Sequence, residues 1–98
     1  MFKNTMRPIH PGEILQVDYL TPLGLSANSL SKALSVPTQR INHIVRERRG
    51  ISADTALRLA RYFDTTARFW LNLQIAFDLR TAEAKVGKKI EKEVQPAT

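Results

Sequence analysis

Apolar residues recur along this chain at intervals of three and four, and no segment alternates in the manner of a β-strand. This spacing places the apolar side chains on one face of successive α-helices, so the pattern predicts an all-α fold of five helices. Capping serines or a leading proline mark the starts of several of them. The expected helices begin near Pro11, Ala27, Pro37, Ala53 and Ala67.

Proline and glycine predict where these helices end. Pro22 and Gly24 are expected to break the first helix. Gly50 is placed to close the third helix, which is expected to run to about Arg48.

The predicted third helix has an unusual polar face. At about 100° per residue, five polar side chains fall within an arc of roughly 140°, whereas Ile41 and Ile44 lie on the opposite side. An exposed helix face is normally rich in Lys and Glu, which are good helix formers. Side chains of the kinds found here match base edges in the DNA major groove, which admits one helix. We interpret the stripe as a DNA-reading face, with an ordinary solvated face as the alternative. It consists of Thr38, Gln39, Asn42, His43 and Arg46.

The short helix before this stripe completes a helix-turn-helix motif, because only "SVP" separates the two helices. Ser26 is a good N-cap for the first helix of the pair. The free N–H groups at the start of that helix, together with Ser26 and Asn28, can receive a DNA phosphate. Arg40 lies at the border of the stripe, where it can reach a phosphate.

Charge supports this interpretation weakly. The chain of 98 residues carries a net charge of +6. Six arginines fall between Val36 and Arg61 against Glu47 and Asp54, a local net charge of +4. A positive surface is expected of a protein that binds phosphate backbones. Arginines that only keep a domain soluble would give the same composition.

The predicted fifth helix is apolar on two faces and is expected to run from Ala67 at least to Arg80, with a weaker continuation toward Val94 that Gly87 should break. One face can close the core, and the other needs a partner. A second copy of the chain is the simplest partner, because two-fold dimers are the commonest assembly. The alternative is a central helix wrapped by the other four. The predicted dimer interface comprises Phe69, Leu71, Leu73, Ile75, Phe77 and Leu79.

Other chemistry finds little support in the sequence. There is no cysteine, and His10 and His43 lack the spacing of metal ligands; His10 is expected to help dock the first helix. No glycine-rich phosphate loop or activated nucleophile is evident, so we expect no catalytic residue, metal or cofactor, and no enzyme. No secretory signal or run of 18 apolar residues is present, so we expect a cytoplasmic protein without a membrane partner.

The segment "LGLSANSLSKALSVPTQRINHIVRERRGISADTALRLARYF" resembles the helix-turn-helix of the phage-repressor and Cro superfamily, also called the XRE superfamily. The flanking "HPGEIL" and "DTTARFWLNLQIAFDLR" make the chain similar to the HigA family of antitoxins, also called the VapI group. This resemblance covers roughly Met6 to Arg80. It implies a five-helix, lambda-repressor-like DNA-binding domain.

The resemblance also implies roles for individual residues. Thr38, Gln39 and His43 match positions that contact bases. The positions near the DNA backbone are matched by Ser26, Asn28, Arg40, Asn42 and Arg46. Ala27 departs from the pattern, since several phage repressors have glutamine there and alanine cannot form its hydrogen bond.

The family implies a homodimer that binds double-stranded DNA at a palindromic operator, represses its own operon and in many members neutralises a RelE-like ribonuclease toxin. A solitary helix-turn-helix regulator without a toxin is the alternative, and RNA binding is weaker because no exposed aromatic platform is evident. We expect a lead-in over residues 1–10, a helix-turn-helix domain with a dimerising fifth helix over residues 11–80, and a basic, partly helical extension over residues 81–98.

Overall fold

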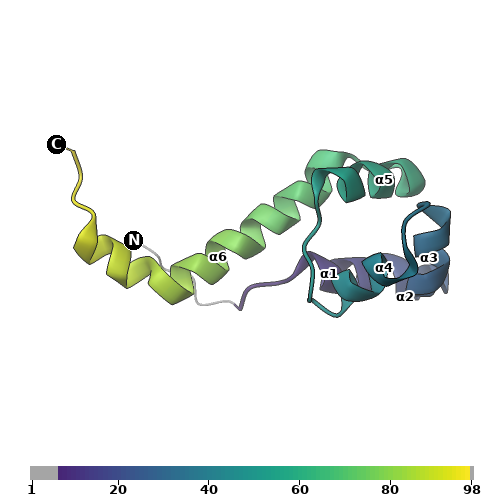
Figure 1. The fold of residues 1–98 in the computed structure, drawn as a ribbon, viewed down its shortest axis with the longest axis horizontal. Helices are drawn as coiled ribbons and strands as arrows, with labels where there is room; N and C mark the ends of the chain where they lie inside the picture. The colour runs from purple at the N-terminus through teal and green to yellow at the C-terminus, as the bar shows by residue number, and fades with distance from the viewer. Residues whose placement is uncertain (1–6, 98) are drawn as a thin grey trace.

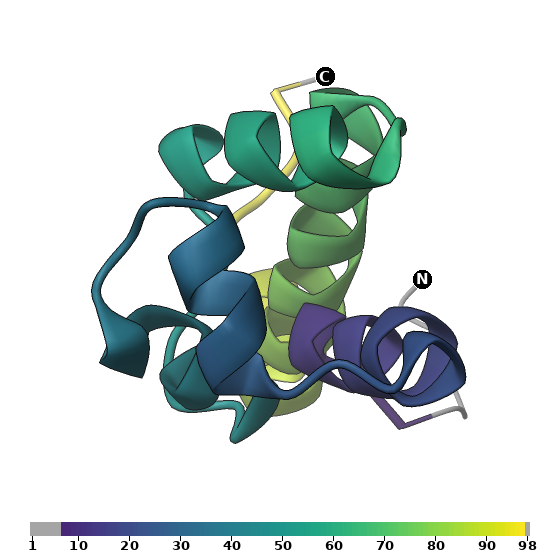
Figure 2. The same ribbon diagram turned by 90° about the vertical axis from the view of Figure 1, so that its right-hand side faces the viewer.

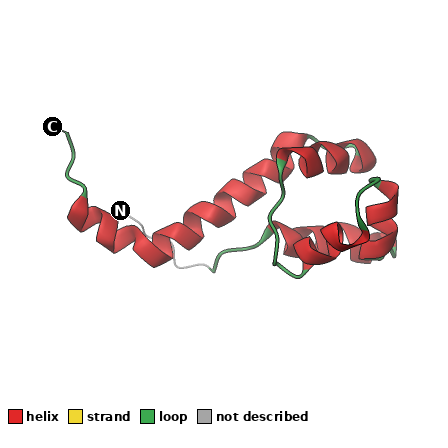
Figure 3. Cartoon of the chain, viewed as in Figure 1, coloured by secondary structure: helices red, strands yellow, loops and turns green. Residues whose placement is uncertain are grey.

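The computed structural model describes residues 7–97, so most of the predicted lead-in, residues 1–6, lies outside the described part. Within residues 7–97 the chain is helical without a strand (Figures 1 and 3), as the sequence predicts. The elements are α1 (Pro11–Ile14), the π-helical segment η1 (Leu15–Leu20), α2 (Thr21–Leu23), α3 (Ala27–Ala33), α4 (Thr38–Val45), α5 (Ala53–Phe63) and α6 (Ala67–Glu93). Because α1, η1 and α2 follow one another without a gap, they form one continuous first helix.

The prediction that Pro22 breaks the first helix is wrong. The turn before Pro22 is widened, and the Thr21 N–H donates to the carbonyl of Gln16, five residues earlier. This π-type turn lets the chain pass Pro22, which has no N–H to donate, without leaving the helical conformation. The helix ends instead at Gly24, whose φ is +65°, so that part of the prediction is confirmed.

The third helix ends earlier than predicted, at Val45, and Gly50 does not close it. Glu47 does so in a left-handed conformation with φ of 62°, while the Arg48 N–H donates to the His43 carbonyl at 2.8 Å. Ser35 ends α3 in the same way, with φ of 59°. Both ends are Schellman motifs in which a side-chain-bearing residue occupies the position that glycine prefers. A Cβ added at Gly50 would lie 2.8 Å from Oε1 of Gln74, so the Gln74 amide, which accepts from the Ile51 N–H, would have to shift.

The core lies between the first helix, α3, α4, α5 and the beginning of α6. Trp70 is fully buried there, and its indole Nε1 donates to the Thr65 hydroxyl at 2.9 Å. Its ring lies against Tyr19 of the first helix and Phe69 of its own helix, with centroids 4.9 and 5.0 Å away. The buried apolar side chains are Leu15, Leu20, Leu30, Leu34, Ile41, Ile44, Ile51, Ala56, Leu59 and Trp70.

His10 docks the first helix, as expected from the sequence. The residue is 4% exposed, and Nδ1 accepts a hydrogen bond from the Gly12 N–H at 2.9 Å, so the neutral imidazole caps α1. The ring edge also meets Phe77 of α6, with centroids 4.8 Å apart. Burial lowers the pKa of His10, because the charged form loses its hydration.

The last helix is longer and more regular than predicted. It runs from Ala67 to Glu93 as one helix and passes through Gly87, so the expected break at Gly87 is wrong. A single glycine costs a helix about 1 kcal/mol, which its neighbours offset. The second half of α6 extends beyond the other helices and gives the molecule dimensions of 51 × 22 × 20 Å (Figure 1). A view along the long axis shows α5 at the top and α3, α4 and the first helix below it, around the axis of α6 (Figure 2).

The left-handed conformation of Glu47 predicts a stabilising substitution. We expect Glu47→Gly to raise the free energy of unfolding by about 1 kcal/mol, because glycine adopts positive φ without a steric cost. Gly24→Ala is the matched control, since a Cβ there meets no atom within 4 Å and adds only the backbone cost. It should lower the same quantity by a similar amount. Urea denaturation measures both, and an unchanged or lower midpoint for Glu47→Gly would contradict the prediction.

The cap made by His10 predicts a pH dependence. The folded protein has a lowered His10 pKa, so folding releases a proton and stability is fully present above the unfolded pKa of about 6.5. We expect the free energy of unfolding to fall as the pH drops below that value and to level off below the folded pKa. His10→Asn keeps a capping acceptor without titrating, so its unfolding profile between pH 7.5 and 5 should be flatter. Parallel profiles for the two proteins would show that His10 is not the group responsible.

Candidate nucleic-acid interface

Helices α3 and α4 form the predicted helix-turn-helix. Ile41 and Ile44 of α4 are fully buried, together with Leu30 of α3, so the apolar side of α4 holds it against the domain. Ser31, buried in α3, donates from its hydroxyl to the Thr38 carbonyl at 3.1 Å. This bond ties the start of α4 to α3 and fixes the orientation of the polar face.

The predicted base-reading residues lie on the side of α4 that faces away from the core. Thr38 and Gln39 are exposed in its first turn, and His43 is half-buried one turn further on. Arg46, a predicted backbone contact, is exposed just beyond the last residue of the helix. The structure therefore presents these four side chains on one surface, with Thr38 and Gln39 at its leading edge.

The predicted backbone contacts at the start of α3 join this surface. Ser26 caps α3, its hydroxyl accepting from the Ser29 N–H at 3.0 Å. Asn42 of α4 donates through Nδ2 to Oδ1 of Asn28 at 2.7 Å and to the Thr38 carbonyl at 3.2 Å. Asn28 and Asn42 thus lie side by side across the two helices. We name this continuous surface the polar face; it comprises Ser26, Asn28, Thr38, Gln39, Asn42, His43 and Arg46.

Arg40 stands apart from the polar face. It points toward α5, where Nη1 donates to Oδ2 of Asp54 at 3.1 Å. Its side chain is only 22% exposed, and its Nε is buried without a hydrogen-bond partner among the described residues. The structure brings the other predicted DNA residues together and places Arg40 in a separate ion pair.

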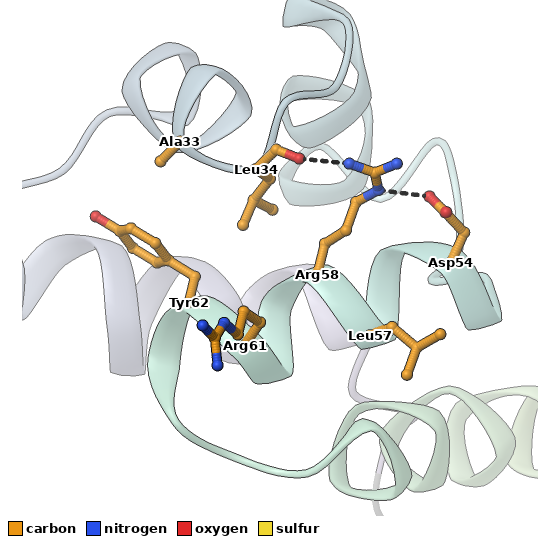
Figure 4. A pocket seen from close by; sticks show the side chains of 7 residues that line it. All are labelled: Ala33, Leu34, Asp54, Leu57, Arg58, Arg61 and Tyr62. Carbon is orange, nitrogen blue, oxygen red and sulfur yellow. Dashed lines mark hydrogen bonds and ion pairs between the residues drawn. The ribbon is translucent and has the colours of Figure 1, made fainter.

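Asp54 and Arg58 are two further residues of this region that the sequence interpretation missed. Arg58 donates from Nε to Oδ2 of Asp54 at 2.9 Å and from Nη1 to the Leu34 carbonyl at 2.8 Å (Figure 4). The pKa of the Asp54 carboxyl is lowered, chiefly by the hydrogen bond from Arg58 and then by the charges of Arg58 and Arg40. The spacing of four residues between Asp54 and Arg58 predicts their pairing in a helix. No sequence signal predicts Arg40 as a second partner.

Some of the predicted dimer residues pack against their own chain, and the others are exposed. Leu71 and Leu73 are half-buried against the core of their own chain, and Phe77 packs on His10. Phe69 is 37% exposed beside Trp70 and Tyr19. Ile75 and Leu79 are 55% and 59% exposed. Further along α6, Val86 and Ile90 are also exposed apolar side chains.

Within residues 7–97, no three His, Cys, Asp or Glu side chains are grouped so that they could hold a metal ion. Among the described helices, none combines the length and the apolar character needed to cross a membrane.

Comparison with known proteins agrees with this geometry. The family model for helix-turn-helix proteins matches residues 18–70. Virulence-associated protein I of Dichelobacter nodosus is 64% identical over 81 residues, which cover 83% of this chain and 75% of that protein.

Two solved structures have nearly the same fold. The Pseudomonas aeruginosa antitoxin HigA with the higBA promoter is 54% identical, with a TM-score of 0.92 over 94% of this chain and 100% of that one. The antitoxin GraA in complex with its operator is 56% identical, with a TM-score of 0.91 over 98% and 97% of the two chains. The chain therefore belongs to the helix-turn-helix family of transcriptional regulators and, within it, to the HigA antitoxin group.

Proposed function

We propose that this protein is a sequence-specific DNA-binding repressor of the HigA antitoxin type, which binds a palindromic operator as a homodimer and represses its own operon. The polar face of α4, presented by a rigid helix-turn-helix, is the observation that carries this proposal. Its activity is binding without a chemical step, and it takes place in the cytoplasm, where the DNA lies. The HigA and GraA structures named above contain promoter or operator DNA, which supports the same role here.

Thr38, Gln39 and His43 are the proposed base readers. The first turn of a recognition helix enters the major groove most deeply, and Thr38 and Gln39 occupy that turn with exposed side chains. The amide of Gln39 can donate and accept together, as adenine N6 and N7 require. His43 follows Gln39 by four residues and therefore lies on the same side of the helix.

Ser26, Asn28, Asn42 and Arg46 are the proposed backbone contacts. The amide of Asn42 donates to both Oδ1 of Asn28 and the Thr38 carbonyl, which fixes its position, so the Nδ2 group of Asn28 is the amide donor left for a phosphate. The beginning of α3 adds free backbone N–H groups, which favour a phosphate. Arg46 adds an exposed positive charge at the opposite end of α4. Such contacts position the protein without reading sequence.

The proposed dimer uses the open side of α6. Ile75, Leu79, Val86 and Ile90 lie within about 60° of one another around the helix axis, and all four are substantially exposed. The second half of α6, which carries Val86 and Ile90, extends beyond the other helices of its own chain (Figure 1). Covering such a stripe with its counterpart from a second copy removes apolar surface from water and gives the two-fold symmetry that a palindromic operator needs.

Neutralisation of a RelE-like ribonuclease toxin is the second part of the proposal, supported by the antitoxin names of the relatives. A solitary regulator is the alternative. The neighbouring gene separates the two: a small basic ribonuclease encoded directly beside this gene supports the antitoxin, and its absence supports the solitary regulator.

The base-reading proposal is tested with a duplex selected from a random DNA pool and a scrambled duplex of equal composition. Gln39→Ala or Thr38→Ala should cost on the order of 1–3 kcal/mol on the selected duplex and reduce the preference between the two. Arg46→Ala should weaken both duplexes equally. Gln95→Ala, an exposed glutamine beyond α6, is the matched control and should change neither. Equal affinity of the wild-type protein for both duplexes would refute specific reading.

The dimer proposal predicts that Leu79→Asp yields a monomer at micromolar concentration, because a charge in an apolar interface is costly to bury. Light scattering during size-exclusion chromatography measures the mass directly. Leu57→Asp is the matched control, since Leu57 is 64% exposed on α5, away from the stripe, and this variant should remain dimeric. A dimer that survives Leu79→Asp, or a wild-type monomer, would rule out this interface.

A further inference from the structure

Arg58 anchors a short chain of polar contacts to the backbone of the helix-turn-helix. Its Nη1 donates to the carbonyls of Leu34 and Ser35, at 2.8 and 3.4 Å, in the turn between α3 and α4. Its Nε donates to Oδ2 of Asp54 at 2.9 Å (Figure 4). Because the guanidinium is planar and held at both ends, the Asp54 carboxylate is held in place as well.

The same carboxylate oxygen accepts a second guanidinium. Arg40, in the first turn of α4, donates from Nη1 at 3.1 Å. With its side chain 22% exposed and Nε buried, this arginine has little room to choose another rotamer. Its Nη2 makes no hydrogen bond among residues 7–97 and, unlike Nε, is not fully buried, so one edge of the guanidinium is bound and another edge is open.

Resting on the proposed function, we propose that Asp54 is a positioning residue for DNA binding: it fixes Arg40 so that the open edge of its guanidinium meets a backbone phosphate beside α4. A flexible arginine must lose side-chain freedom when it binds a phosphate, whereas Arg40 is ordered before DNA arrives. A charge-assisted bond from a fixed guanidinium is then gained at a smaller entropic cost. The phosphate is contacted by Arg40, and Asp54 acts through it.

This role predicts that removing Asp54 changes the affinity for DNA in the opposite direction from removing an ordinary surface carboxylate. A carboxylate near DNA repels phosphates, so removing one should strengthen binding. Removing Asp54 should weaken binding, because the loss of a positioned arginine outweighs the lost repulsion. Asp18, an exposed carboxylate of the first helix, is the matched control.

The test measures fluorescence anisotropy with a random-sequence duplex over a range of salt concentrations, with thermal unfolding to confirm that each variant is folded. Asp54→Ala should weaken binding by about ten-fold and lower the salt slope by about 0.9 per protomer, the value for one phosphate contact. Asp18→Ala should bind as tightly as the wild type or more tightly, without a lower slope. In an Arg40→Ala background, Asp54→Ala should cause no further loss. Asp54→Asn, which keeps the side-chain shape, serves if the alanine variant does not fold.

Three results would overturn the inference: binding by the Asp54 variant that matches Asp18→Ala, a loss that persists in the Arg40→Ala background, or a loss without a change of slope. A purely structural role of Asp54 would give the last result. Failure of the wild-type protein to bind any duplex would overturn the proposed function and the inference together. Equal binding of selected and scrambled DNA would refute only the base-reading proposal, because the Asp54 test uses a random-sequence duplex and does not depend on sequence preference.

Discussion

The burial of Trp70 is the interaction on which the arrangement of the helices depends. Its ring meets the first helix through Tyr19, while its indole N–H bonds to Thr65 in the turn between α5 and α6. One side chain therefore joins the beginning of α6 to the first helix and to the turn between α5 and α6. Since the neutral indole has its partner and its surface lies wholly inside, no buried polar atom is left unsatisfied there. The direction in which α6 leaves the domain follows from this contact.

The polar face carries a constraint of a different kind, because its amides already bond to one another. Asn28 and Asn42 bridge α3 and α4 at 2.7 Å, so the two helices present their polar side chains in a fixed relation. Rigid presentation favours specificity, since a mismatched base edge cannot be met by a small shift of a loop. Arg40 belongs to a second system, in which Asp54 and Arg58 of α5 link α4 to the turn that follows α3.

Sequence periodicity predicted the helices well, because each buries an apolar face and begins at a recognisable cap, as Ser26 and Ser52 do. It failed where backbone conformation is imposed by the surrounding structure. Glu47 and Ser35 adopt positive φ although their side chains do not favour it, because buried Ile44 and Leu34 fix the chain on one side. The widened turn before Pro22 has no local signature either. The polar face of α4 was predictable from helical geometry, whereas the contact of Arg40 with Asp54 joins residues 14 positions apart and emerges only from folding.

Because α6 is uninterrupted, it fixes the rotational position of the exposed apolar stripe relative to the helix-turn-helix. Its 27 residues span about 40 Å at 1.5 Å per residue, with no hinge at Gly87 to absorb a twist. One residue inserted in its second half would rotate Val86 and Ile90 by about 100° relative to Trp70. Seven inserted residues, nearly two full turns, would restore their direction and lengthen the helix by about 10 Å. In the proposed dimer, the number of residues in α6 therefore sets how the two domains are oriented relative to each other.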